Sequence, residues 1–216
     1  MKIKTDISQI RFKYKKEPFD IKNSHSDPFK QFSKWLNEAI RNKVFEATAM
    51  TLSTVNKTNK VSSRIVLLKG IENNSFVFYT NFNSRKSKEL KNNKNVAAVF
   101  WWPQLGKQVR IEGYVKLVNK KRSDHYFSTR SRKSQIGAWA SNQSSVLKDR
   151  KTLLKKFEII KKRFANKEVL RPNFWSGYEI NPFLIEFWQG RENRLHDRIV
   201  YKKIGKKKWK KYRLNP

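Results

Sequence analysis

The sequence contains no cysteine and little acidic charge, and both absences restrict what the protein can be. With 0 Cys among 216 residues, it has no disulfide framework, no thiolate nucleophile and no cysteine-based zinc or iron–sulfur site. Its three histidines, His25, His125 and His196, are far apart in the chain, so we expect no metal site. The 17 Asp and Glu residues face 50 Lys and Arg residues, which gives a formal net charge of +33.

Long apolar runs and closely spaced glycines are also missing. The longest apolar run, residues 96–102, is far shorter than the ~18 residues of a membrane span. The charged opening residues 1–6 lack the apolar core of a signal peptide, so we expect a cytoplasmic protein that does not bind membranes. No two of the 7 glycines form a Gly-x-Gly pair, which excludes the dinucleotide fingerprint and the Walker A loop. Any phosphate must therefore be held by side chains, helix N-termini and isolated backbone amides.

The surplus positive charge predicts attraction to phosphate without saying which kind. Nucleic acid, anionic lipid and a small phosphorylated ligand all fit a charge of +33. The abundant Asn, Ile and Phe residues are favoured by A+T-rich codons, so drift of composition on solvated surfaces is an equal alternative. Charge alone does not identify the partner.

The remaining composition predicts a folded domain, because 38% of the residues are hydrophobic and 13% are aromatic. Residues 1–24 are charged and interrupted by Pro18, and we interpret them as an N-terminal segment that is mobile or folds over a site. Residues 25–216 contain no repeat or linker and are expected to form one domain. Asp27 and Pro28 predict a helix start, since apolar residues follow at helical spacing over 29–40.

Most of the rest of the chain predicts strands. A second helix, expected over 148–165, has an apolar stripe and a lysine-rich face that we expect to be solvated. Because several strands follow one another without helices, we expect antiparallel pairing in a mainly β fold with flanking helices, of the α+β class. The expected strands cover 47–55, 63–69, 75–80, 96–101, 108–118, 182–189, 194–202 and 209–214.

One row of cations stands near the C-terminus. Gly190 predicts a hairpin, and if residues 194–198 are extended, Arg194, His196 and Arg198 share one face of the strand. Such a row either is solvated or binds an anion.

Two further polar clusters leave the same choice open. Tyr126, Arg130 and Ser134 are four residues apart and share a face if this region is helical, so they form either a phosphate site or an ordinary polar helix face. Residues 83–87 place Arg85 and Lys86 at a predicted helix start, which is either a phosphate site or a surface turn.

Taken together these stretches resemble one family. Residues 185–198, with Glu-Phe-Trp-Gln followed by Arg-Leu-His-Asp-Arg, resemble the signature of pyridoxine/pyridoxamine 5′-phosphate oxidases. Residues 64–69, 78–80, 84–86, 134–139, 143–145 and 213–216 match the family in the same order. The resemblance covers nearly the whole chain from about residue 25.

The resemblance implies an FMN-binding split β-barrel of the antiparallel Greek-key type, assembled as a homodimer with FMN sites at the interface. The implied reaction oxidises pyridoxine or pyridoxamine 5′-phosphate to pyridoxal 5′-phosphate, with O2 accepting the electrons and forming H2O2. It implies no specific nucleic-acid partner. The implied FMN contacts are Arg64, Ile65, Val66, Leu67, Leu68, Lys69, Tyr79, Thr80, Arg85, Lys86, Gln108, Gln143, Ser144, Trp188 and Arg198.

The same resemblance implies a substrate site. Arg194 and His196 are the implied catalytic residues, and they would hold the substrate over the flavin. Arg11 and Tyr14 would contribute to a lid, although residues 11–14 depart from the pattern of some relatives. The implied substrate contacts are Lys69, Tyr126, Arg130, Ser134, Arg194, His196, Arg11 and Tyr14.

One feature of the implied FMN site conflicts with a regular strand. Arg64 and Lys69 differ by an odd number and face opposite ways in a straight strand, so we predict a bend, a bulge or a strand end between them. Two other functions are alternatives: a basic nucleic-acid-binding protein, and another split-barrel flavin oxidoreductase.

Overall fold

The computed structural model describes residues 5–10, 14 and 17–216, and its chain divides into two compact units. Unit 1 comprises Met1–Ala47, Phe100–Arg110 and Leu184–Pro216, and unit 2 comprises Thr48–Val99 and Ile111–Phe183. The expected domain boundary at residue 25 stays a prediction.

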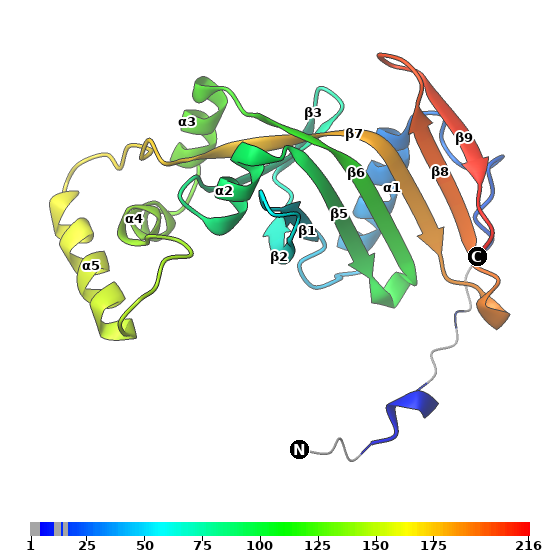
Figure 1. Ribbon diagram of the computed structural model, residues 1–216, viewed down its shortest axis with the longest axis horizontal. Coiled ribbons are helices and arrows are strands. Elements are labelled where there is room, and N and C mark those ends of the chain that lie inside the picture. The colour runs from blue at the N-terminus through cyan, green and yellow to red at the C-terminus, as the bar shows by residue number, and fades with distance from the viewer. Residues whose placement is uncertain (1–4, 11–13, 15–16) are drawn as a thin grey trace. The chain divides into compact units, whose positions relative to one another are not determined.

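Unit 2 is built on an antiparallel sheet (Figure 1). The strands follow one another in the order β2-β1-β5-β6-β7-β4-β3, and the last residues of β5 and the first of β6, like the second half of β7, belong to unit 1. Antiparallel pairing was predicted and is confirmed. The strands are β1 (Ala49–Val55), β2 (Val61–Leu67), β3 (Gly70–Glu72), β4 (Ser75–Asn81), β5 (Asn95–Trp102), β6 (Lys107–Leu117) and β7 (Trp175–Gln189).

Strand β3 is too short to be expected from the sequence, and turn geometry explains it. Asn73 and Asn74 have φ angles of 50° and 58°, and they join Glu72 to its partner Ser75 in a two-residue hairpin. Asn tolerates the left-handed region that such a hairpin requires. The turn therefore pairs β3 with β4.

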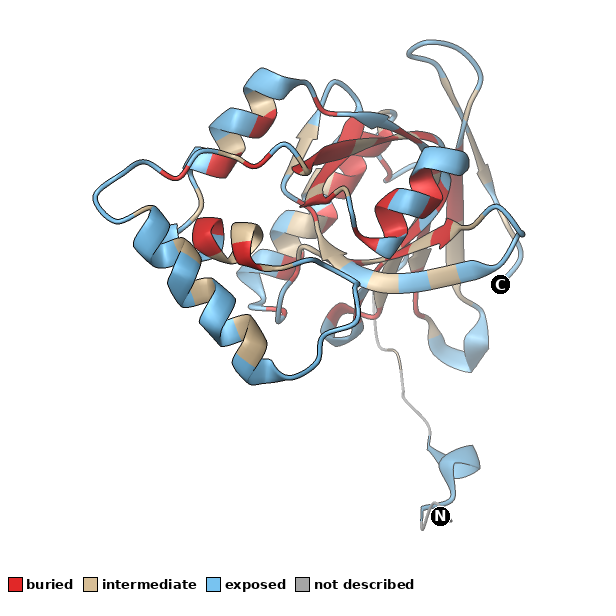
Figure 2. Ribbon diagram, turned by 60° about the vertical axis from the view of Figure 1, so that its left-hand side comes forward, coloured by how far each residue is buried: buried red, intermediate tan, exposed pale blue. Residues whose placement is uncertain are grey.

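The helices of unit 2 are α2 (Arg85–Asn92), α3 (Lys120–Ser128), α4 (Arg132–Ala140) and α5 (Arg150–Arg163). Figure 1 shows α4 and α5 side by side. A buried cluster of Phe127, Ile136, Val169 and Trp175 joins the helices to the start of β7. The predicted helix over 148–165 is confirmed, and its lysines are exposed, but its apolar stripe is only half-buried (Figure 2).

Unit 1 contains helix α1 (Pro28–Arg41), which begins where it was predicted. The Asp27 carboxylate accepts a hydrogen bond of 2.8 Å from the Phe29 N–H, so Asp27 is the N-cap. The buried face carries Phe29, Phe32, Trp35 and Ala39, whereas Ile40, expected in the apolar stripe, is 52% exposed. The face of α1 that packs against the core therefore extends from Phe29 to Ala39 and does not include Ile40.

The C-terminal half of β7 pairs in unit 1 with β8 (Asp197–Lys203), which pairs with β9 (Trp209–Arg213). In the part of the chain that the structure describes, the remaining elements are the short 3₁₀ turns η1 (Ile7–Gln9), η2 (Pro103–Leu105) and η3 (Glu192–Arg194). No helix among the described residues is both long enough and apolar enough to span a membrane.

The expected row of Arg194, His196 and Arg198 along one strand is wrong. A hairpin does follow Gly190, but β8 begins only at Asp197. Asn193 and Arg194 have φ angles of 55° and 61°, so the chain coils through η3 before it becomes extended. Alternation along a strand therefore does not apply to Arg194 and His196.

Candidate active site

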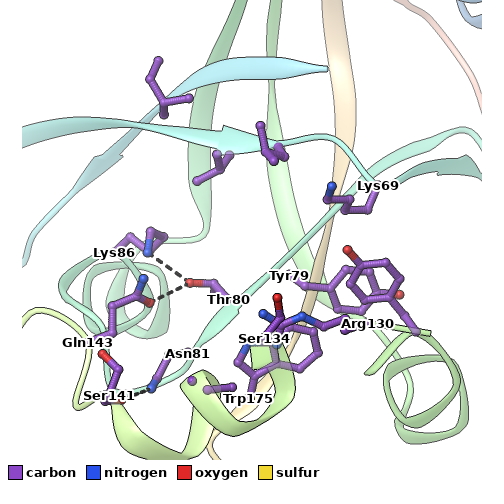
Figure 3. Close-up of a pocket in the computed structure, with 16 residues that line it drawn as sticks. Lys69, Tyr79, Thr80, Asn81, Lys86, Arg130, Ser134, Ser141, Gln143 and Trp175 are labelled. Atoms are coloured by element: carbon purple, nitrogen blue, oxygen red, sulfur yellow. Dashed lines mark hydrogen bonds between the residues drawn. The ribbon is translucent and has the colours of Figure 1, made fainter. Parts of the chain in front are cut away.

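Unit 2 contains a pocket of about 490 Å³, a volume typical of small-molecule sites (Figure 3). Its walls come from β2, β4, the first turn of α2, the α3–α4 region and the start of β7. The lining residues are Ile65, Val66, Leu67, Lys69, Tyr79, Thr80, Asn81, Lys86, Tyr126, Arg130, Ser134, Gly137, Ala138, Ser141, Gln143 and Trp175.

The charge of this lining is uniformly positive. Lys69, Lys86 and Arg130 line the pocket, and the lining includes no Asp or Glu. Among the described residues, none of these three cations forms an ion pair with a carboxylate. A pocket whose cations lack carboxylate partners is suited to a phosphate.

Lys86 is buried at one side of the pocket. Its Nζ donates to the Thr80 hydroxyl at 3.0 Å and to the Ser84 hydroxyl at 3.3 Å, and the same Thr80 hydroxyl donates to the Gln143 side chain at 3.3 Å (Figure 3). Burial, and secondarily the positive charge of Arg64, lower the pKa of Lys86 to about 8. An anion bound here would stabilise the charged form.

Arg130 lies apart from Lys86 in the same pocket (Figure 3). Its guanidinium carbon is 4.7 Å from the centre of the Trp175 ring, and its Nη1 is buried without a hydrogen-bond partner. Burial lowers the pKa of Arg130, which is still protonated at neutral pH. A buried N–H without a partner is rare, and a ligand oxygen would satisfy it.

Tyr126, Arg130 and Ser134 do line one pocket, but not as one helix face. Tyr126 belongs to α3, Arg130 to the turn after it, and Ser134 to α4. The Gln135 side chain donates to the backbone oxygens of Phe127 and Ser128 at 2.9 and 3.3 Å, which fixes α4 against the end of α3. The three residues therefore share a pocket without sharing a helix face, and their role in binding a phosphate stays a prediction.

The predicted irregularity between Arg64 and Lys69 is confirmed as a strand end. Strand β2 ends at Leu67, and Lys69 follows it to the pocket, whereas Arg64 is not among the lining residues. The Arg64 guanidinium donates instead to Thr54, Ser62 and Glu89, at 2.6, 2.5 and 3.4 Å. Glu89 also accepts from Arg85 at 2.9 Å, and although burial opposes its ionisation, hydrogen bonds lower its pKa to about 2.

Four of the unit 2 residues implied as FMN contacts do not line the pocket in this chain: Arg64, Leu68, Arg85 and Ser144. Conversely, sequence reasoning missed five lining residues: Asn81, Gly137, Ala138, Ser141 and Trp175. Asn81 follows Thr80 directly, Gly137 and Ala138 lie within the matching stretch 134–139, and Ser141 lies between it and the stretch 143–145, so proximity could have identified them. No local signal marks Trp175.

Unit 1 holds a second group of implied residues, gathered around an aromatic cluster. Trp188 and His196 have ring centres 4.5 Å apart, and the Tyr14 ring lies 5.7 Å from the first and 5.8 Å from the second, edge-on to both. Tyr14 also covers Gly106 and Gly190, where an added Cβ would overlap its ring. Of the two implied lid residues, Arg11 lies outside the described residues.

His196 is held in one tautomer by the loop that precedes it. Its Nδ1 accepts a hydrogen bond of 3.1 Å from the Arg191 N–H, so in the neutral ring the proton resides on Nε2. Partial burial, and then the charge of Arg194, lower the pKa of His196 below 6.5. Both effects favour the neutral ring, which carries its N–H on Nε2.

The other residues of unit 1 implied by the resemblance differ in their hydrogen bonds and in their exposure. Arg198 donates from Nε to Glu186 at 2.7 Å, and Glu186 accepts from Arg110 Nη1 at 2.9 Å. Arg194 is exposed, and Gln108 in β6 is half-buried. The described residues contain no group of three or more His, Asp and Glu side chains that could hold a metal ion.

The antiparallel sheet and a pocket whose lining carries cations and no carboxylate fit the class of proteins that bind phosphorylated small molecules. Comparison with known sequences identifies the family. Residues 36–164 match the family model described as pyridoxamine 5′-phosphate oxidase, and residues 175–216 match the model of the pyridoxine 5′-phosphate oxidase C-terminal dimerisation region. The chain belongs to the pyridoxine/pyridoxamine 5′-phosphate oxidase family.

Individual relatives agree over nearly the full length. A pyridoxine/pyridoxamine 5′-phosphate oxidase of Leptospira interrogans is 50% identical over 97% of this chain and 98% of its own. The enzyme of the same name from Vesicomyosocius okutanii is 45% identical over 99% of this chain and 100% of its own.

Solved structures support the expected split-barrel fold. PhzG from Burkholderia lata, in complex with tetrahydrophenazine-1-carboxylic acid, has a TM-score of 0.88 at 27% identity, covering 95% of this chain and all of its own. A pyridoxamine 5′-phosphate oxidase-related, FMN-binding protein from Nostoc punctiforme has a TM-score of 0.72 at 14% identity, covering 88% of this chain and 97% of its own, which bears on the fold alone.

Proposed function

We propose that this protein is an FMN-dependent oxidase that converts pyridoxine 5′-phosphate and pyridoxamine 5′-phosphate to pyridoxal 5′-phosphate. The observation that carries the proposal is the pocket of unit 2, where Lys86 and Arg130 lie apart and neither has a carboxylate partner among the described residues. A reaction between a phosphorylated cofactor and a phosphorylated substrate needs two such cations. Family membership supports the same reaction.

The residues around Lys86 fit the phosphate of FMN. Lys86 supplies a buried cation, and the hydroxyl of Thr80 and the amide of Gln143 adjoin it. Strand β2 offers the adjacent wall through residues 65–67, where the flavin ring would lie. When bound, FMN supplies the acceptor for the hydride equivalent that leaves the substrate, and O2 takes up the electrons as H2O2. The further FMN contacts implied by the resemblance, Arg64, Leu68, Arg85, Gln108, Ser144, Trp188 and Arg198, remain predictions.

The residues around Arg130 fit the phosphate of the substrate. Arg130 offers the unpaired Nη1, and Tyr126, Ser134 and Lys69 add two hydroxyls and a second cation to the same lining. Charge-assisted hydrogen bonds of this kind fix orientation as well as affinity. Holding the phosphate determines which substrate carbon faces the acceptor.

The proposed role of His196 is hydrogen-bond donation rather than proton abstraction. Its Nδ1 accepts from the Arg191 N–H and the lowered pKa favours the neutral ring, so Nε2 would present its proton to a substrate oxygen. Arg194 is exposed in η3 and is proposed to hold the substrate with His196. Both catalytic assignments come from the resemblance.

We further propose a homodimer with FMN at the interface, supported by the match of residues 175–216 to a dimerisation region. The cytoplasmic location expected from the sequence is part of the proposal. Light scattering of the purified protein tests the dimer, and cell fractionation tests the location.

The deciding experiment measures H2O2 release from pyridoxine 5′-phosphate, pyridoxamine 5′-phosphate and reduced nicotinamide by the yellow, FMN-loaded protein. We expect turnover of one or both vitamin phosphates. Turnover of reduced nicotinamide alone would make the protein a flavin reductase. Tight, salt-sensitive nucleic-acid binding without flavin uptake would overturn the proposal.

The structural match to PhzG provides a second candidate, because that structure contains a tricyclic carboxylic acid. The paired phosphate sites and the 50% identity to the Leptospira enzyme favour the vitamin phosphates over a substrate without phosphate. Adding tetrahydrophenazine-1-carboxylic acid to the same assay separates the two functions.

A further inference from the structure

Arg130 is held on an aromatic support that the proposed function does not account for. The rings of Tyr126, Tyr79 and Trp175 are nearly parallel, with Tyr79 4.0 Å from Tyr126 and 5.4 Å from Trp175 between ring centres. The Arg130 guanidinium lies 4.7 Å from the Trp175 ring centre and 5.6 Å from that of Phe127. These aromatic side chains confine the guanidinium.

The position of Trp175 is fixed by the sheet and by a buried arginine. In the β4–β7 register Trp175 pairs with Asn81 and Gly177 pairs with Tyr79, and a Cβ at Gly177 would lie 2.8 Å from the Tyr79 ring. The missing side chain lets Tyr79 pack close to Trp175. Arg171, whose side chain is 9% exposed, donates to the Trp175 carbonyl at 2.5 Å and to Asp124 of α3 at 2.7 Å.

The packing of rings around Arg130 leaves one nitrogen of its guanidinium, Nη1, for a ligand. Because no carboxylate pairs with Arg130 among the described residues, its orientation depends on the ring contacts and on its chain connection. Arg130 Nη1 is nevertheless buried and unsatisfied in a pocket that Ser134 and Tyr126 also line. A carboxylate in place of Trp175 would orient the guanidinium too, but it would neutralise the charge that a phosphate needs.

We propose that Trp175 is a positioning residue for the substrate phosphate: its ring holds the Arg130 guanidinium in place by a cation–π contact without neutralising it. The proposal rests on the assignment of Arg130 to the substrate phosphate. Trp175 acts through Arg130, so it affects the affinity for the substrate. It does not affect the affinity for FMN or the rate at which bound substrate reacts.

The test compares Trp175→Leu with the matched variant Trp139→Leu. Trp139 also carries an arginine, with Arg163 5.3 Å from its ring centre, and it does not line the pocket. For Trp175→Leu we expect about a tenfold rise in KM for pyridoxine 5′-phosphate and an equal rise in the Kd of 4-deoxypyridoxine 5′-phosphate, measured by calorimetry on the FMN-loaded enzyme. In Trp175→Leu, kcat and the FMN Kd should stay within about twofold of their values in the unchanged enzyme. In Trp139→Leu, KM for pyridoxine 5′-phosphate and the Kd of 4-deoxypyridoxine 5′-phosphate should stay within the same limit.

A double-mutant cycle with Arg130→Gln separates positioning from general structural damage. Arg130→Gln alone should raise KM about 100-fold, and Trp175→Leu added to it should raise KM no further. Full additivity of the two effects would overturn the proposal, as would an unchanged Kd in Trp175→Leu. If Arg130→Gln leaves KM unchanged, the substrate assignment under the proposed function fails as well.

The conservative variant keeps the test decisive if Trp175→Leu does not fold. Trp175→Phe retains a smaller π face, so it should raise the Kd of 4-deoxypyridoxine 5′-phosphate about threefold and leave the FMN Kd unchanged. An unchanged Kd of 4-deoxypyridoxine 5′-phosphate would contradict a role through Arg130. An equal loss of affinity for this ligand and for FMN would contradict it too.

Discussion

The cations of the unit 2 pocket and those of strands β8 and β9 in unit 1 have opposite environments. Lys86 and Arg130 line a pocket without a carboxylate, whereas Arg198 pairs with Glu186 at 2.7 Å and Arg213 pairs with Asp197 at 2.7 Å. A paired arginine contributes to structure, and a buried cation without a carboxylate is available to an anion. With a net charge of +33, the missing carboxylate identifies the site better than the density of positive charge does.

The largest expected effect comes from removing Glu186, the carboxylate that pairs with Arg198 and Arg110 in unit 1. Glu186→Ala removes the buried carboxylate that accepts from both Arg198 and Arg110, so the free energy of unfolding should fall by about 3 kcal/mol, measured by urea denaturation. Glu158→Ala, which removes an exposed pair with Lys161, should change it by less than about 0.5 kcal/mol. Equal effects would mean that burial of the carboxylate does not matter.

In the pocket the opposite change should affect binding. Lys86→Gln removes the buried cation and should raise the FMN Kd about 30-fold, or about 2 kcal/mol, measured by quenching of flavin fluorescence. Lys88→Gln, an exposed change of the same charge on the same helix, is the control. Riboflavin has no phosphate, so its affinity should not respond to Lys86→Gln. A parallel loss of riboflavin binding would argue against a phosphate contact.

Because Lys86 has no carboxylate partner among the described residues and its pKa is lowered, we predict that FMN binding depends on pH. Its lowered pKa of about 8 means that it is charged at pH 7 and mostly neutral at pH 9, while the phosphate of FMN is a dianion at both. The FMN Kd should therefore rise about tenfold between pH 7 and pH 9. Lys86→Gln should abolish most of this slope. The same slope in that variant would assign the titration to another group.

The smallest effect concerns the aromatic cluster of unit 1. Gly190→Ala would displace the Tyr14 ring and should raise the KM for pyridoxine 5′-phosphate about threefold. This factor corresponds to the loss of one aromatic contact that contributes about 0.7 kcal/mol. Gly205→Ala, where the added Cβ meets only ordinary contact at 3.7 Å, is the matched control. In a Tyr14→Ala background Gly190→Ala should add nothing. A further loss there would show that the glycine matters for another reason.

Much of the fold followed from short-range patterns. Asp27 with Pro28 marked the start of α1 because an N-cap and a fixed φ act within one turn. The period of two located most strands, but it failed at Arg194, whose positive φ in η3 carries no sequence signal for a non-glycine residue. Arg130 and Ser134 line one pocket although the helix assumed to join them ends at Ser128.

The sequence by itself determined the family and the strand-rich class, and it predicted most of the residues that line the unit 2 pocket, since ordered motifs identify these without coordinates. Only the tertiary structure decided which cations are neutralised and what supports them. Trp175 lies under Arg130 because the register of β4 and β7 and the contact of α4 with α3 bring distant segments together. The pairing of Glu186 with Arg198 likewise depends on the β7–β8 register. Such contacts depend on long-range geometry, which local composition and spacing do not encode.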